Sequence, residues 1–106
     1  MRLSDDGSTV VLDLHGARVD EALGAARKAL SRAVRAGRHR LDLVHGTSTT
    51  DVHEARPTIK RALHAWLEAM PAGVRQAQRG EAVLSLYLDV TARPDARRLA
   101  LRDVLA

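Results

Sequence analysis

The stretch Val10-Val11-Leu12-Asp13-Leu14-His15-Gly16 decides the fold, because it has the pattern of a buried strand that ends in a His-Gly step. A second run of the same kind, Arg40-Leu41-Asp42-Leu43-Val44-His45-Gly46, follows an amphipathic segment. Short apolar runs closed by glycine are typical of buried strands, and two strands joined through a helix are expected to be parallel. Ligands of open α/β sheets bind beyond the carboxyl ends of the strands. The pattern therefore predicts that both His-Gly steps lie at one rim of the sheet, where a functional site is expected.

The rest of the chain predicts an α/β protein built as an α+β two-layer sandwich. One helix is expected from Asp20, as its N-cap, to about Ala36, and a second from Pro57 to about Met70, each with apolar residues at helical spacing. Residues 82–90 alternate apolar and polar side chains and predict the strongest strand, at the end of a hairpin. Since each strand has one apolar face, both helices are expected on one face of the sheet. The predicted order is β-α-β-α-β-β, with parallel core strands and a further helix at the C-terminus.

The length of 106 residues predicts one domain. Residues 1–9 are interpreted as a polar tail, residues 10–90 as the folded domain, and residues 91–106 as a C-terminal helical extension. No apolar stretch approaches the roughly 18–20 residues of a membrane span, and the first residues lack the apolar core of a secretory signal. Cysteine is absent, which excludes disulfides and thiolate metal sites. These features favour a cytoplasmic protein that does not enter a membrane, and they predict no oligomeric state.

The net charge of +4 favours an anionic partner such as nucleic acid, bound through its phosphates. An arginine-rich composition inherited from a GC-rich coding background is an equally good explanation of the charge. The aromatic residues are limited to Trp66 and Tyr87, and Trp66 belongs to the apolar stripe of its helix. Contact with the backbone of the nucleic acid is therefore expected, rather than sequence recognition by stacked bases.

Two histidines at one rim suit the cleavage of phosphodiester bonds. A neutral imidazole accepts a proton from the attacking hydroxyl while a protonated imidazole serves the leaving oxygen, a mechanism that needs no metal. Asp13 is expected on the same side of its strand as His15, where it orients the imidazole or joins Asp42 and Asp89 in holding Mg²⁺. The structural alternative is that each histidine only caps a strand end. Metal-free and Mg²⁺-dependent chemistry both stay open, and a structural zinc site is not expected.

Phosphate-binding candidates surround the two motifs, in loops, near helix N-termini and at the final hairpin. His64, on the second predicted helix, is expected to face solvent. The basic residues of the first predicted helix are most simply a solvated face, although they are also placed to extend a nucleic-acid track: Arg27, Lys28, Arg32 and Arg35. The phosphate-binding candidates are Gly16, Arg18, Gly46, Thr47, Ser48, Arg56, Lys60 and Arg79.

Several motifs occur in a fixed order along the chain: Leu12-Asp13-Leu14-His15-Gly16, Glu21-Ala22, Gly37, Val44-His45-Gly46 and Leu63-x-x-Trp66-Leu67. Together they resemble the Smr (small MutS-related) domain over about residues 10–90. The resemblance implies a β-α-β-α-β sandwich of the stand-alone type, with a nuclease or nucleic-acid-binding role on DNA or RNA. It also implies the site residues Asp13, His15 and Gly16 in the first motif, and His45 and Gly46 in the second.

The second motif departs from the family pattern, which usually continues to another glycine as HGxG. This chain has Ser48 at that position, and it has Arg79-Gly80-Glu81 where a Gly-Gly pair commonly precedes the last strand. Three functions are therefore weighed. The first is an endonuclease centred on His15 and His45, and the second is a binding module that has lost turnover. The third is a protein-interaction adaptor that uses the open face of the sheet and the C-terminal helix, with an exposed patch made of Leu101, Val104 and Leu105.

Overall fold

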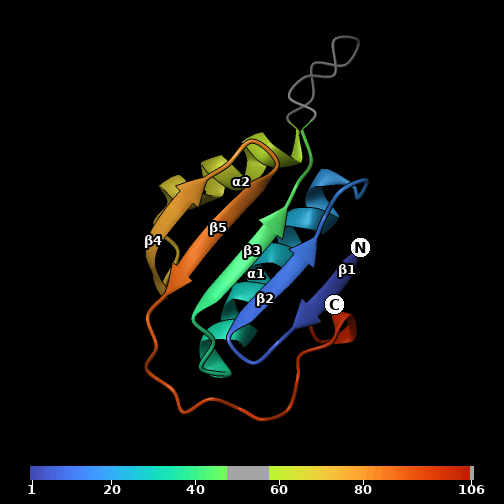
Figure 1. Ribbon diagram of the computed structural model, residues 1–106. Coiled ribbons are helices and arrows are strands. Elements are labelled where there is room, and N and C mark those ends of the chain that lie inside the picture. The colour runs from blue at the N-terminus through green and yellow to red at the C-terminus, as the bar shows by residue number, and fades with distance from the viewer. Residues whose placement is uncertain (48–57, 106) are drawn as a thin grey trace.

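The two His-Gly runs form neighbouring parallel strands in a computed structural model that describes residues 1–47 and 58–105 (Figure 1). The first run gives β2 (Thr9–Asp13) and the second gives β3 (Arg40–Val44), with Leu12 opposite Leu43. The connection between them contains α1 (Val19–Arg35). The predicted parallel pairing and its helical connection are confirmed. The helix begins one residue before Asp20 and has Arg18 as its N-cap, so the expected capping by Asp20 was wrong.

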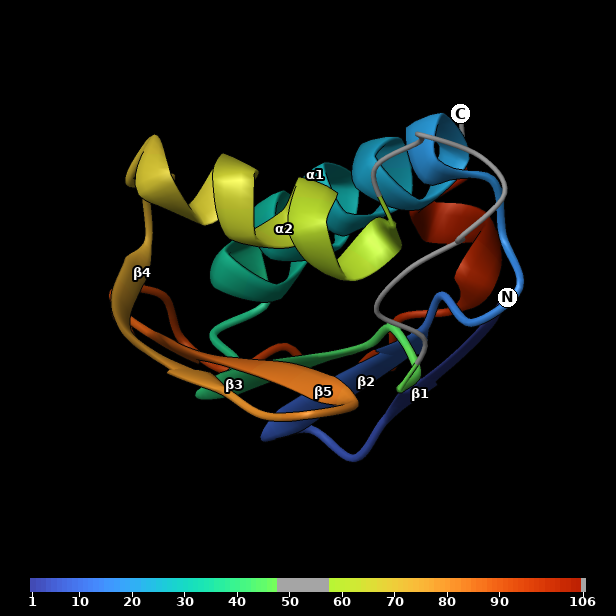
Figure 2. The ribbon, with the colours of Figure 1, turned by 90° about the horizontal axis from the view of Figure 1, so that it is seen from above.

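The sheet is mixed and has five strands in the order β1-β2-β3-β5-β4. An N-terminal strand, β1 (Arg2–Asp5), forms one edge, and the hairpin of β4 (Val74–Arg79) and β5 (Val83–Leu88) forms the other. The parallel arrangement predicted for the core strands holds for β2 and β3. It does not hold for β5, which runs antiparallel to β3. Helix α1 and helix α2 (Ile59–Glu68) lie on the same face of the sheet, which confirms the two-layer architecture (Figure 2).

The core lies between the sheet and the two helices. Alanines dominate the buried face of α1, and their small side chains let this helix lie close to the strands. Alternate leucines of β2, β3 and β5 project into the same layer, as their period of two predicts. The fully buried leucine and valine side chains are Val10, Leu12, Leu14, Leu41, Leu43, Leu63, Leu84 and Leu86, together with Val104 near the C-terminus.

The N-terminal segment is a strand and not the polar tail predicted for residues 1–9. Strand β1 pairs antiparallel with β2, placing Leu3 opposite Leu12, and Leu3 packs against the core. The turn between these strands is closed by Asp6, whose carboxylate accepts the N–H of Thr9 at 2.7 Å. Gly7 occupies the turn with a φ of +95°. The Asp-Gly step is a hairpin signal, and it is the feature of the sequence that predicts this strand.

The C-terminal segment is a strap and not the predicted helix over 91–106. Residues 89–100, named here the C-terminal strap, run in extended form along the molecule and end in a 3₁₀ turn, η1 (Leu101–Asp103). The chain is held extended because its backbone groups bond to distant partners, such as Asp95 N–H to the carbonyl of Ala36 at 2.9 Å. Val104 is 1% exposed and Leu101 is half-buried, so the exposed patch expected for an adaptor is mostly used inside the fold.

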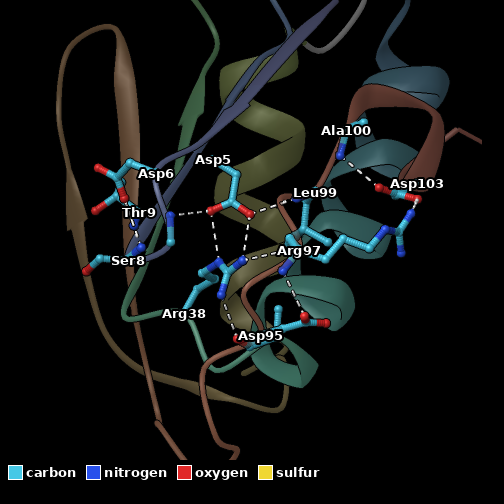
Figure 3. A network of polar contacts seen from close by, with 12 residues as sticks. Asp5, Asp6, Ser8, Thr9, Arg38, Asp95, Arg97, Leu99, Ala100 and Asp103 are labelled. Atoms are coloured by element: carbon cyan, nitrogen blue, oxygen red, sulfur yellow. Dashed lines mark hydrogen bonds and ion pairs between the residues drawn. The ribbon is translucent and has the colours of Figure 1, made fainter.

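A buried ion pair, named here the Asp5–Arg38 clasp, ties β1 to the end of α1 and to the strap (Figure 3). Both side chains are fully buried, and Arg38 Nε donates to Asp5 Oδ1 at 2.8 Å. The guanidinium also donates to the carbonyls of Ala36 and Arg97, while Asp5 accepts the N–H of Leu99 at 2.8 Å. Burial alone would raise the pKa of Asp5, but these hydrogen bonds and the charge of Arg38 hold it below its ordinary value. Among the described residues, no helix is long and apolar enough to cross a membrane.

Candidate functional site

The two His-Gly steps meet at the carboxyl ends of β2 and β3. Gly46 has a φ of +84°, and a Cβ added to it would lie 2.8 Å from Cδ2 of His15. The His15 ring therefore rests directly on the Gly46 backbone, and only glycine leaves room for it there. His15 is exposed. The expectation that both motifs lie at one rim, named here the His-Gly rim, is met by this contact.

Asp13 shapes the backbone of the first step. Its carboxylate accepts the N–H of His15 at 2.9 Å, and Leu14 N–H donates to the carbonyl of Val44 at 2.8 Å. The chain then turns through Gly16, whose φ is +81°. The sequence had placed Asp13 beside the imidazole of His15, whereas the structure gives it a bond to the backbone of the same residue. Asp13 therefore positions His15 through the main chain.

His45 lies beneath α2 and is only 5% exposed, in contrast to His15. Its backbone N–H donates to the carbonyl of Ala82 at 2.9 Å, and the N–H of Gly46 donates to the same oxygen at 3.1 Å. Its Nδ1 lies 2.7 Å from the carbonyl oxygen of Gly46, which can only accept, so Nδ1 carries the proton. The expectation that both imidazoles face the rim is therefore met by His15 and not by His45. The buried ring braces the Gly46 turn, and the two backbone N–H groups hold that turn against the β4–β5 hairpin.

His64 is the residue that sequence reasoning missed. It was expected to face solvent, but its ring packs edge-on against that of His45, with centroids 6.2 Å apart and planes at 88°. Within the described part of the chain, Nε2 of each ring is buried and has no hydrogen-bond partner. Burial lowers the pKa of His64, and the charges of Arg79, His45 and Lys60 lower it further. We name the two rings the His45–His64 pair.

Two predicted phosphate-binding cations gather around the His45–His64 pair. Lys60 lies one turn before His64 on the same side of α2. Arg79, at the end of β4, forms an ion pair with Glu68 at 2.5 Å. That bond lowers the pKa of Glu68. Lys60 therefore brings a positive charge to the α2 side of the rim, while the charge of Arg79 is offset by Glu68.

The remaining candidates divide between the rim and the undescribed segment. Arg18 is exposed at the N-cap of α1, where its Nε lies 3.7 Å from Asp20. Thr47 is exposed directly after Gly46. The predicted phosphate-binding residues Ser48 and Arg56 lie outside the described residues.

The carboxylates proposed for Mg²⁺ do not form a cluster. Asp42 is bound to Arg40 at 3.0 Å, and Asp13 to its own backbone turn. In residues 1–47 and 58–105, no group of three histidine, aspartate or glutamate side chains is placed to hold a metal ion.

Comparison with known proteins decides the family. A family model described as the Smr domain matches residues 12–84. The chain belongs to the Smr domain family. The crystal structure of the Smr domain of Thermus thermophilus MutS2 is similar, with a TM-score of 0.61 and 26% sequence identity. That match covers 74% of this chain and 96% of the other. No curated protein sequence matches the chain significantly.

The Smr match begins inside β2 and ends inside β5, so it contains both His-Gly steps and the whole of α1 and α2. Strand β1 and the C-terminal strap lie outside it. The His-Gly rim thus belongs to the Smr domain proper, while the Asp5–Arg38 clasp joins this domain to its two flanks.

Proposed function

We propose that this Smr domain is an endonuclease that cleaves the phosphodiester bonds of nucleic acid at the His-Gly rim. The contact of the exposed His15 ring with Gly46 carries this proposal, because it joins the two motifs into one surface that a phosphate can reach. Nucleic-acid binding and nicking endonuclease activity are known in the Smr family, which supports the choice of substrate.

Within this proposal the two histidines have different roles. His15 is exposed, so it exchanges a proton with the attacking or leaving oxygen of the substrate. His45 is buried and donates through Nδ1 to the carbonyl of Gly46, so it positions the turn on which His15 rests. Asp13 fixes the other side of the contact through the N–H of His15.

The phosphate is held by cations and by backbone N–H groups at the same rim. Arg18 stands at the N-terminus of α1, where the helix dipole also favours an anion. Lys60 and Arg79 supply positive charge from the α2 side. The experiment below separates metal-free acid–base chemistry from Mg²⁺-dependent hydrolysis.

The test compares His15→Ala with His39→Ala, a second exposed histidine at the opposite end of β3. Each protein is incubated with end-labelled single-stranded RNA, structured RNA and supercoiled plasmid DNA, with Mg²⁺ or with EDTA. A positioned acid or base contributes about 10²–10⁴-fold to a rate, so His15→Ala is expected to lose cleavage by at least about 10²-fold. His39→Ala is expected to cleave as the wild type does.

The substrate and EDTA lanes identify the chemistry. Cleavage of RNA alone, unaffected by EDTA, indicates attack by the 2′-hydroxyl with histidine acid–base catalysis. Cleavage abolished by EDTA indicates metal-assisted hydrolysis. Salt-sensitive binding without cleavage of any substrate would refute the nuclease and favour the binding module, which the serine in place of the second motif glycine already suggests.

A further inference from the structure

We propose that the outer face of α1 is a second nucleic-acid-binding surface, which holds the phosphate backbone at a distance from the His-Gly rim. The surface consists of Arg27, Lys28, Arg32 and Arg35, named here the α1 basic stripe. The inference shares with the proposed function only the identity of the ligand and does not require that the ligand be cleaved.

The four cations share one side of the helix. At about 100° per residue, Arg27 and Arg32 mark the limits of an arc of about 140° that contains all four residues. Every member is exposed, whereas the opposite side of α1 is made of buried alanines that face the sheet. From Arg27 to Arg35 the stripe is about 12 Å long. A duplex carries roughly seven phosphates over that length.

The four side chains of the stripe lack acidic partners among the described residues, as do a few scattered exposed cations such as Arg75 and Arg93, but only the stripe gathers four such cations on one helix face. None of its four side chains forms an ion pair with any residue in the described ranges. Lys28 and Arg32 are spaced i,i+4, and Arg32 and Arg35 are spaced i,i+3, so like charges face each other on the helix and destabilise it. An anionic ligand would remove that repulsion. Elsewhere the ion-paired arginines are Arg18, Arg38, Arg40, Arg79 and Arg97.

The helix dipole accounts for the positions of only two of the four cations in the stripe. Arg32 and Arg35 lie in the last turn, where cations stabilise the negative end of the dipole. Arg27 and Lys28 lie in the middle of α1, beyond the reach of that effect. The mid-helix cations are not there to stabilise the dipole, and contact with a polyanion gives them a role.

The C-terminal segment extends the same surface. Arg102 of η1 lines a hollow of about 340 Å³ together with Lys28, Arg32 and Arg35. Asp103 also lines this hollow, but its carboxylate accepts the N–H of Ala100 at 2.7 Å. A fifth cation thus joins the stripe from a part of the chain that lies outside the Smr match.

The position of the stripe on α1 sets a minimum length for a duplex that extends from the His-Gly rim along the whole stripe. Helix α1 starts next to the His-Gly rim and runs away from it (Figure 1). From Arg18 to Arg35 the helix spans about 25 Å, so a duplex of fewer than about eight base pairs is too short to extend from Arg18 to the far end of the stripe. Binding is therefore expected to strengthen with length past that threshold.

The test neutralises the stripe and compares it with a control of equal charge change. The stripe variant is Lys28→Gln/Arg32→Gln/Arg35→Gln, and glutamine keeps the helix propensity. The control variant removes three exposed cations from β4 and the strap: Arg75→Gln/Arg93→Gln/Arg98→Gln. Fluorescence anisotropy measures the affinity of each protein for labelled DNA and RNA duplexes of 6 and 16 base pairs across a salt series.

The stripe variant is expected to bind the long duplex at least about tenfold more weakly than the wild type does. The slope of log K against log salt is expected to be smaller in magnitude by about 2–3, because three phosphate contacts are lost. The short duplex and the control variant are expected to show much smaller changes. The thermal midpoint of the stripe variant should stay level or rise, because like charges have been removed. Cleavage is measured separately on the wild type and the stripe variant, so that a failure of the nuclease proposal is distinguishable from a failure of the stripe.

Three results would overturn the inference. Equal losses in the stripe and control variants would mean that only net charge matters. A wild-type protein that binds no duplex would exclude nucleic acid as the ligand of the stripe. Binding of vesicles with anionic headgroups, lost in the stripe variant while duplex binding is unchanged, would assign the surface to lipid instead.

Discussion

Polar side chains are buried at opposite ends of the sheet, and the two sets differ in how completely they are hydrogen-bonded. In the Asp5–Arg38 clasp, near the start of β2, the buried carboxylate and guanidinium satisfy one another and several backbone groups. In the His45–His64 pair, beyond the carboxyl end of β3, two buried Nε2 atoms have no partner among the described residues. A buried polar group without a hydrogen bond costs stability. The clasp therefore stabilises the fold. The buried histidine pair lowers the stability of the fold, and a role in activity would explain why it is retained.

The clasp is the most sensitive point of the fold, and its loss has the largest expected effect. Arg38→Met leaves the Asp5 carboxylate buried without its cation, which typically lowers the free energy of unfolding by about 3–5 kcal/mol. Urea denaturation measures the change. The control is Arg40→Met, which breaks a partly exposed ion pair with Asp42 worth at most about 1 kcal/mol. Equal losses in the two variants would contradict the structural role given to the clasp.

Substitution of the motif glycines separates backbone strain from contact at the rim. Gly46→Ala and Gly16→Ala each place a side chain at positive φ, which costs of order 1–3 kcal/mol. Gly46→Ala also places its Cβ 2.8 Å from Cδ2 of His15, whereas a Cβ at Gly16 meets no residue within 4 Å beyond its chain neighbours. The NMR signals of the His15 imidazole are therefore expected to shift more strongly in Gly46→Ala. Similar shifts in both variants would show that the ring does not rest on Gly46.

Acid should weaken the clasp in a defined direction. Because the pKa of Asp5 is lowered in the folded protein, the unfolded chain binds the proton first as the pH falls. The stabilisation is complete above the unfolded pKa of about 3.9, and it is lost as the pH falls through the lower folded pKa. Urea midpoints of the wild type should fall over this range, and Asp5→Asn should remove that contribution. Asp20→Asn, an exposed carboxylate near Arg18, should leave it in place.

Substitution within the His45–His64 pair is expected to give the smallest change in stability, and this change is an increase. His64→Leu removes an unpartnered buried nitrogen and is expected to raise the free energy of unfolding by up to about 1 kcal/mol. Since burial and nearby cations lower the pKa of His64, wild-type stability falls as the pH drops below about 6.5, where the unfolded chain takes up the proton. The variant should lose this pH dependence. A marked loss of stability in His64→Leu would show that its Nε2 has a partner.

The sequence predicts the centre of the fold better than its flanks. The two His-Gly runs carry their own signals in apolar patterning and in glycines, and the parallel pair with its helix follows from them. Strand β1 was missed because its four residues, Arg-Leu-Ser-Asp, contain one apolar side chain, although Asp6-Gly7 marks the turn. The strap was missed because the apolar residues that follow it, Leu101, Val104 and Leu105, suit a helix. What holds it extended is Asp5, a residue far away along the chain.

The candidate site shows the same division between local and tertiary information. Neighbouring motifs at the ends of parallel strands are predictable, and so is the exposure of His15. The burial of His45 and its pairing with His64 are not, because they depend on the angle at which α2 crosses the strands. No spacing in the sequence encodes that angle. Residues that act together across two layers are therefore visible only in the structure.

The bond from Leu99 N–H to Asp5 joins positions 94 residues apart, and this has a consequence for synthesis on the ribosome. The Smr region is translated before Leu99, so its sheet and helices have the chance to assemble first. Until the strap leaves the exit tunnel, Arg38 and Asp5 lack some of their native partners. The strap closes the molecule last, and a released chain that ends before residue 99 is expected to carry a formed His-Gly rim on a domain that is not yet fastened.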